Sequence, residues 1–119
     1  MATRQDPIAP LQEFALDLPG AFRDTPWDGD IVAKVGKKIF VFFGSGADPG
    51  AAISVKLPES ADHALSIEGA RPTSYGLGRH GWVTVPVVGT PPDLLQDWIE
   101  ESDRTSATKR FVAELDARG

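Results

Sequence analysis

Apolar and polar residues alternate along several stretches of the chain with the two-residue period of β-strands. The first two stretches, Ile31–Val35 and Lys38–Phe43, flank the turn-forming pair Gly36-Lys37 and predict a β-hairpin. Within the second strand, alternate residues should share a face: Ile39, Val41 and Phe43 on one side, Phe40 and Phe42 on the other. Because this strand is apolar on both sides, we expect it in the middle of a sheet.

Two further strands are expected towards the C-terminus. Ala52–Leu57 follows a glycine-rich loop over Gly44–Gly50 and alternates between apolar and polar residues, which predicts a strand with two different faces. Trp82–Val88 is rich in β-branched residues but contains Pro86. Since proline cannot donate a hydrogen bond to a neighbouring strand, we expect this segment at a sheet edge or at a bulge.

Helical spacing predicts four helices. Pro7–Leu18 begins after an acidic capping residue, and Pro58–Leu65 is a short helix with a proline and an early acid at its start. Thr90–Asp93 resembles a capping box, with the threonine accepting from a backbone N–H. The apolar stripe of the helix that follows consists of Leu94, Leu95, Trp98 and Ile99. An acidic exit at Glu100–Asp103 should lead into a last helix over Thr105–Ala117.

The remaining segments read as loops. Asp24–Asp30 is acidic and turn-rich, and we expect it to cover one end of the core; Arg71–Gly81 is a long polar loop with three glycines. The order of elements predicts an α+β fold, an antiparallel sheet with helices packed on one face. We expect a single domain over residues 1–119.

Composition narrows the class of protein. With 41% hydrophobic and 24% charged residues the chain is globular, and its lack of cysteine excludes disulfides, thiolate catalysis and cysteine-type metal sites. No apolar run is long enough to span a bilayer, and no apolar signal-peptide core follows Met1–Asp6. We therefore expect a cytoplasmic monomer that has no membrane partner.

The charge is unevenly distributed. The net charge of −5 argues against avid, non-specific binding of nucleic acid. Residues 1–30 hold two basic and six acidic side chains and residues 91–119 hold four and seven, whereas residues 31–90 hold six basic against four acidic. The six basic residues are Lys34, Lys37, Lys38, Lys56, Arg71 and Arg79. They predict a mildly basic sheet between acidic ends, although lysines on a sheet also serve solubility and edge protection.

The sequence contains no motif that predicts a catalytic site or a metal site. The two histidines, His63 and His80, lie in different predicted elements without a second ligand at a suitable spacing, so we expect no metal site. The glycines of residues 76–81 match the letters of a dinucleotide fingerprint, but a strand follows them where that motif needs a helix. With no nucleophile or paired carboxylates to name, we expect a protein that is not an enzyme and has no cofactor.

The Arg71–Gly81 loop is a candidate ligand site. Tyr75, His80 and Trp82 place phenol, imidazole and indole groups among glycines and two arginines. Such a set can bind an anion, stack on a base or hold a peptide. Alternatively, Trp82 anchors its strand to the core and the arginines pair with nearby acids.

Short motifs along the chain resemble a known family. They are Leu18-Pro19-Gly20-Ala21, Val35-Gly36-Lys37-Lys38-Ile39-Phe40, Ser54-Val55-Lys56-Leu57, the Pro72–Gly81 loop, Gly81-Trp82-Val83-Thr84-Val85 and a helix pair around Glu101-Ser102. In this order and spacing, over residues 14–115, they resemble the MmcQ/YjbR family of small bacterial domains. The resemblance implies a fold similar to that of CyaY and frataxin, with hairpins in a double-wing arrangement.

The resemblance also implies DNA binding, with a biochemical role that is otherwise uncharacterised. The contacts it implies are the six basic residues Lys34, Lys37, Lys38, Lys56, Arg71 and Arg79. We expect weak, salt-dependent binding of duplex DNA, because few cations are present. The alternative is a non-catalytic protein-interaction or small-anion-binding module that uses Tyr75, His80 and Trp82. Frataxin-like iron binding would need the acids Asp17, Asp24, Asp28 and Asp30, which we interpret instead as a solvated charge cluster.

Overall fold

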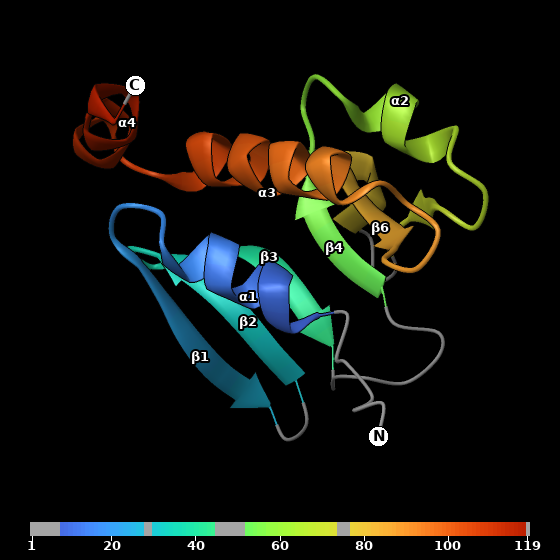
Figure 1. The fold of residues 1–119 in the computed structure, drawn as a ribbon, viewed down its shortest axis with the longest axis horizontal. Helices are drawn as coiled ribbons and strands as arrows, with labels where there is room; N and C mark the ends of the chain where they lie inside the picture. The colour runs from blue at the N-terminus through green and yellow to red at the C-terminus, as the bar shows by residue number, and fades with distance from the viewer. Residues whose placement is uncertain (1–7, 28–29, 45–51, 74–76, 119) are drawn as a thin grey trace, which may run out of the picture.

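Six antiparallel strands form one sheet in the order β1-β2-β3-β4-β6-β5 (Figure 1). The computed structural model describes residues 8–27, 30–44, 52–73 and 77–118. The strands are β1 (Ala21–Trp27), β2 (Asp30–Val35), β3 (Lys38–Gly44), β4 (Ala52–Lys56), β5 (Arg71–Pro72) and β6 (Trp82–Pro86). The predicted hairpin is confirmed as β2 and β3, and the predicted strand after it as β4.

The helices are α1 (Ala9–Leu16), α2 (Ala61–Leu65), the 3-10 helix η1 (Leu77–His80), α3 (Pro92–Ser106) and α4 (Lys109–Ala117). Of these, α1 and α3 cover one face of the sheet (Figure 1), and η1 lies against β5 and β6. In Figure 1, α1 and α3 lie in front of the sheet, and α4 lies beyond the far end of α3. The predicted α+β class, an antiparallel sheet with helices on one face, is confirmed. In the described part of the chain, no helix is long and apolar enough to cross a membrane.

The hydrophobic core fills the space between the sheet and the helices α1 and α3. Its fully or almost fully buried side chains include Leu11, Ala15, Val41, Ile53, Val55, Val85, Leu95, Trp98 and Ile99. The alternation in β4 is the one expected, with Ile53 and Val55 inside. The apolar stripe predicted for α3 is also confirmed, because Leu95, Trp98 and Ile99 are buried in the core.

A bulge in β3 corrects the predicted division of its side chains. Ala33 of β2 lies opposite Val41, but Lys34 lies opposite Ile39, which leaves Phe40 as an extra residue. Phe40 and Val41 are both fully buried in the core. The prediction that Phe40 points away from Val41 is therefore wrong, because the extra residue resets the alternation.

The N-terminal strand was not expected. The loop predicted over Asp24–Asp30 is wrong for residues 24–27, since β1 continues to Trp27 and pairs with β2, while residues 28 and 29 lie outside the described ranges. The register shifts between Asp24 and Trp27, at the position of Pro26. Proline is tolerated there because β1 is an edge strand and needs hydrogen bonds on one side only.

Pro86 occupies a different setting from the one predicted. β6 is not an edge strand, because it lies between β4 and β5. β5 pairs only with Val83 and Thr84, so Pro86 has a partner strand on one side alone, where it faces Ala52. The shortness of β5 allows the proline. β5 and η1 both lie in the segment predicted as a loop.

The boundaries of α3 also differ from the prediction. Thr90 does not cap the helix; its hydroxyl donates to the Pro86 carbonyl at 2.7 Å, and Pro91 occupies the N-cap position. The segment Glu100–Asp103, predicted as an exit, is continuous helix. It stays helical because two of its residues are buried as α3 packs on the sheet.

Candidate functional site

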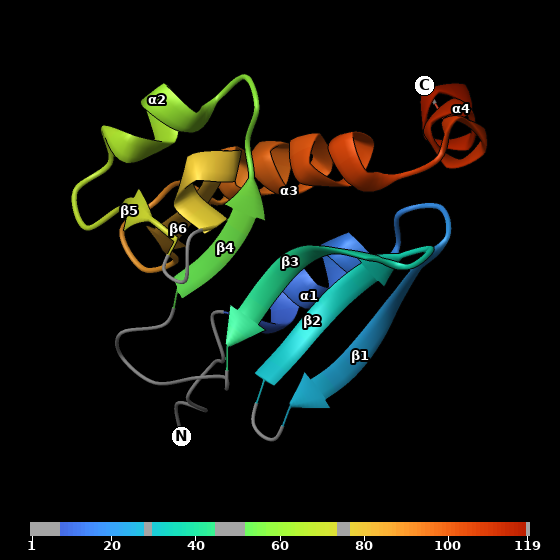
Figure 2. The same ribbon diagram turned by 180° about the vertical axis from the view of Figure 1, so that it is seen from behind.

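We call the sheet face opposite α1 and α3 the back face (Figure 2). Strand register defines it, because side chains paired across antiparallel strands point to the same side. One row crosses all six strands: Asp24, Val32, Phe42, Ser54, Thr84 and Arg71. Beside it lie Phe22, Lys34 and Ile39 on β1 to β3, and Lys56 and Trp82 on β4 and β6. The back face therefore combines cations, aromatic rings and hydroxyls.

The predicted basic residues gather partly on this face. Lys34, Lys56 and Arg71 belong to it, the first two half-buried and the third exposed. Lys37 and Lys38 are exposed where the β2–β3 hairpin turns. Arg79 is also exposed, in η1 beside β5. The six cations thus occupy the back face, the adjoining hairpin turn and a neighbouring helix.

The six predicted cations differ in whether they form an ion pair with a described residue. Lys34 is engaged: its Nζ lies 3.3 Å from an oxygen of Asp24 and 5.9 Å from the centre of the Phe22 ring. The other five predicted cations form no ion pair with any residue in the described ranges. A phosphate can therefore approach those five without displacing a carboxylate of the described residues.

Aromatic residues line the middle and the edge of the back face. The Phe42 and Trp82 rings meet edge-on, 5.2 Å apart. Trp82 is only 8% exposed, and its indole is buried in the back face against Phe42 rather than in the core beneath the helices, where the alternative interpretation placed it. Phe22, on the edge strand, is 44% exposed. Sequence reasoning missed Phe22 because it did not predict β1.

The rest of the predicted ligand loop is only partly placed. His80 lies exposed at the end of η1, and Tyr75 lies outside the described residues. Near the start of the loop, the Thr73 hydroxyl is 3.0 Å from that of Thr84, which is 2.8 Å from that of Ser54. This chain of hydroxyls ties the segment after β5 to the centre of the back face.

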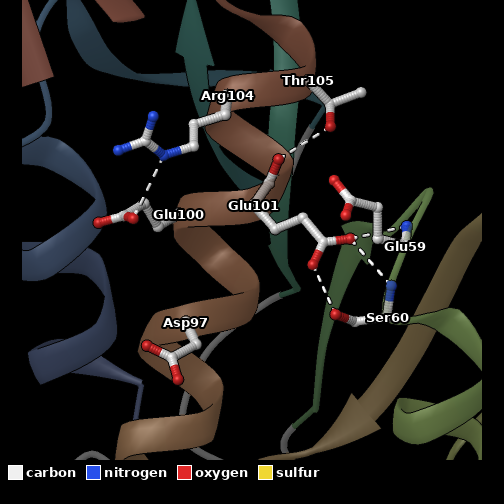
Figure 3. A pocket seen from close by; sticks show the side chains of 7 residues that line it. All are labelled: Glu59, Ser60, Asp97, Glu100, Glu101, Arg104 and Thr105. Atoms are coloured by element: carbon white, nitrogen blue, oxygen red, sulfur yellow. Dashed lines mark hydrogen bonds and ion pairs between the residues drawn. The ribbon is translucent and has the colours of Figure 1, made fainter. Parts of the chain in front are cut away.

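An acidic pocket lies on the other side of the molecule (Figure 3). It has a volume of about 460 Å³ and is lined by Glu59, Ser60, Asp97, Glu100, Glu101, Arg104 and Thr105. Glu101 has a structural role, since its carboxylate accepts from the backbone N–H groups of Glu59 and Ser60 at 3.0 and 3.1 Å and from the Ser60 hydroxyl at 2.6 Å. These bonds hold the turn before α2 against α3.

Arg104 offsets part of this acidity. Its guanidinium lies 2.8 Å from Asp116 of α4 and 3.3 Å from Glu100. The bond to Asp116 is the main cause that raises the pKa of Arg104 above its usual value. The ion pair also joins α4 to α3.

No metal site emerges from the described residues, among which no three acidic or histidine side chains gather to hold an ion. Of the acids considered for iron, Asp17 pairs with Arg118 at 3.4 Å and Asp24 with Lys34. Asp28 lies outside the described residues, and the side chain of Asp30 is not described.

Two consecutive polar residues of α3, Ser102 and Asp103, are buried against the sheet, and the first of them fixes the helix to it. The Ser102 hydroxyl donates to the Phe40 carbonyl at 2.6 Å and accepts from the Lys56 N–H at 2.9 Å. It thereby bridges β3 and β4 just beyond the point where their pairing ends at Val41 and Val55. The next residue, Asp103, is 1% exposed, and neither carboxylate oxygen has a hydrogen-bond partner among the described residues. Burial raises the pKa of Asp103 to about 6.

Comparison with known proteins gives a family and a fold. A family model described as YjbR matches residues 16–104. No curated protein matches the chain. The crystal structure of Deinococcus radiodurans protein DR2400, with a DUF419 domain, is similar with a TM-score of 0.74 and 22% identity, covering 98% of this chain and 92% of that one. A Pseudomonas syringae protein is similar with a TM-score of 0.67 and 18% identity, covering 82% and 97%.

Proposed function

The chain belongs to the YjbR family, and from that premise we propose that it is a non-catalytic domain that binds DNA through the back face of its sheet. The separation of charge is the observation that carries the proposal. Lys34, Lys56 and Arg71 share the back face, whereas four carboxylates surround the pocket beside α3. A polyanion is attracted to the first surface and repelled by the second.

Binding on the back face should be weak. Five of the six predicted cations are free of ion pairs with described residues, but the whole chain carries a net charge of −5. Each phosphate that a cation neutralises releases counterions, so affinity falls with salt in proportion to the number of contacts. With three to six contacts, we expect a dissociation constant in the range of roughly 10⁻⁴ to 10⁻⁶ M that weakens steeply as salt rises.

A titration of fluorescently labelled DNA at low salt, followed by anisotropy, tests this function. The double variant Lys56→Glu/Arg71→Glu reverses two back-face charges and should weaken binding by at least about ten-fold. The matched control Lys109→Glu/Arg110→Glu makes the same change in net charge on exposed residues of α4. The proposal fails if the unaltered protein does not bind, or if both double variants lose affinity equally.

The loop around η1 supports a second candidate, a module that binds a small anion or an acidic segment of a protein. Arg79 and His80 are exposed on η1, and Arg71 is exposed on the neighbouring β5. Three donors of this kind suit a phosphate or carboxylate group. Titration with inorganic phosphate, followed by NMR, should then shift the amide signals of these residues alone. Shifts scattered over the whole protein would count against the loop as the site.

A further inference from the structure

The strand register arranges the back-face cations at regular intervals. Lys34 lies on β2. Lys56 lies two strands further across the sheet, on β4, and Arg71 lies two strands beyond Lys56, on β5. Neighbouring strands lie about 4.8 Å apart, so measured across the strands successive cations are separated by about 10 Å and the outer two by about 19 Å. Lys34 and Lys56 each lie two residues beyond the row that contains Arg71, in the same direction, so the three cations form an oblique line across the sheet.

Uncharged side chains occupy the strands between these cations. β3 contributes Ile39 and Phe42, and β6 contributes Trp82 and Thr84. At the β1 edge, Phe22 lies beside Lys34 and is 44% exposed. Cations and uncharged groups thus alternate from strand to strand along the line.

The width of this line decides which form of nucleic acid suits it. The major groove of DNA is about 12 Å wide and admits a helix or a two-stranded ribbon, so a line of cations spread over five strands cannot enter it. A duplex would touch this face only with the outside of its backbone. A single strand can follow the whole line, with phosphates on the cations and a base on an exposed ring.

We propose that the back face takes single-stranded nucleic acid, which crosses the strands along Lys34, Lys56 and Arg71 and stacks a base on Phe22. This inference rests on the proposed function and replaces the duplex expected from the sequence. Lys34 is the weakest contact of the line, because a phosphate must compete there with Asp24 at 3.3 Å. Lys56 and Arg71, which have no such competitor among the described residues, carry most of the binding.

The duplex alternative uses a different part of the molecule. The β2–β3 hairpin is a two-stranded ribbon, with Lys37 and Lys38 exposed at its turn. A ribbon of this kind fits a major groove. The two arrangements therefore predict opposite effects of charge reversal at the hairpin and on the back face.

The test compares three probes of one sequence and about 15 nucleotides, the upper range of a single-strand site: single-stranded DNA, single-stranded RNA and duplex DNA. Anisotropy at low salt should give a dissociation constant for the single strands about ten-fold lower than for the duplex, and a salt slope of about −2 for three phosphates. Equal dissociation constants for single-stranded DNA and single-stranded RNA would show that the protein recognises the phosphate backbone and the faces of the bases, which both strands have. A preference for one of them would name the natural class.

Variants separate the two arrangements. Lys56→Glu/Arg71→Glu should weaken single-strand binding by about ten-fold or more, and Lys37→Glu/Lys38→Glu by no more than about three-fold. Phe22→Ala should weaken it by roughly five-fold, because a lost stack removes part of the base contact. Its matched control is Leu65→Ala, which truncates an exposed apolar residue on α2. Thermal unfolding of each variant checks that the fold is retained.

Two results would overturn the inference: a duplex that binds as tightly as the single strands, or binding that is lost in the hairpin variant and kept in the back-face variant. The first result leaves DNA binding on the back face intact, whereas the second moves DNA binding to the hairpin and so also removes the back face from the proposed function. If neither form binds at low salt, the proposed function fails as well, so the two failures are distinguishable.

Discussion

Replacing Asp103 by asparagine should stabilise the protein at neutral pH. The residue is 1% exposed, and neither of its carboxylate oxygens has a hydrogen-bond partner in the part of the chain that the structure describes. Burial raises its pKa from 3.8 to about 6, against the opposing charge of Arg104 and with a smaller contribution from Glu100. Its position near the C-terminal end of α3 adds to the cost of a negative charge there.

The size and sign of the effect follow from this shift in pKa. A difference of about two units corresponds to ~3 kcal/mol between the protonated and the charged form. Because the folded state binds this proton more tightly than the unfolded chain, stability falls as pH rises from 3.8 to about 6 and the full cost applies above that. Asparagine avoids the charge but still buries an amide, so we expect a gain of about 1–3 kcal/mol at pH 7.

Urea unfolding at several pH values between about 4 and 8 measures the effect. The free energy of unfolding of Asp103→Asn should exceed that of the unaltered protein at neutral pH, and the difference should vanish towards pH 4. Asp97→Asn removes an exposed carboxylate from the same helix and should change stability by less than about 0.5 kcal/mol. Parallel pH profiles for Asp103→Asn and the unaltered protein would refute the reasoning.

Two further experiments test how α3 and α4 are attached. Ser102→Ala should cost about 2–4 kcal/mol, because the Lys56 N–H and a β3 carbonyl lose their shared partner; denaturant unfolding measures the loss, and faster amide exchange at Lys56 would identify its source. Gly20→Ala should cost more than Gly36→Ala, although both glycines have positive φ. A Cβ at Gly20 would lie 2.6 Å from the Phe111 ring, whereas a Cβ at Gly36 would have no described atom within 4 Å. The free energies of unfolding of the two variants should therefore differ by about 1–3 kcal/mol. Equal unfolding free energies for these two variants would show that α4 does not pack on this turn.

Much of the fold could be predicted from local pattern. The β2–β3 hairpin, β4 and the buried stripe of α3 follow from alternation or helical spacing that agrees with their burial. β1 could not be predicted, because Asp24 and Pro26 favour a turn and only pairing with β2 makes the segment a strand. The bulge at Phe40 is likewise a property of the pairing, since nothing in its own sequence marks an extra residue.

The basic residues of the candidate site could be predicted from the sequence, but their arrangement on the sheet could not. Segment counts already single out the six basic residues. Which of them share a face depends on strand order, and only the order β4-β6-β5 brings Arg71 onto the same side as Lys56. Phe22 was missed together with β1. Local composition therefore identifies the chemistry of this surface, and long-range pairing supplies its geometry.

The most direct test of the back face as the binding surface is an NMR titration of the isotope-labelled protein with DNA at low salt. The amide signals of residues on this face, such as Lys34, Lys56, Arg71 and Thr84, should shift progressively and return as salt is raised. Signals from α3 around the acidic pocket should stay unchanged. Shifts centred on α3 or α4, or no shifts at all, would contradict the proposal that the back face binds DNA.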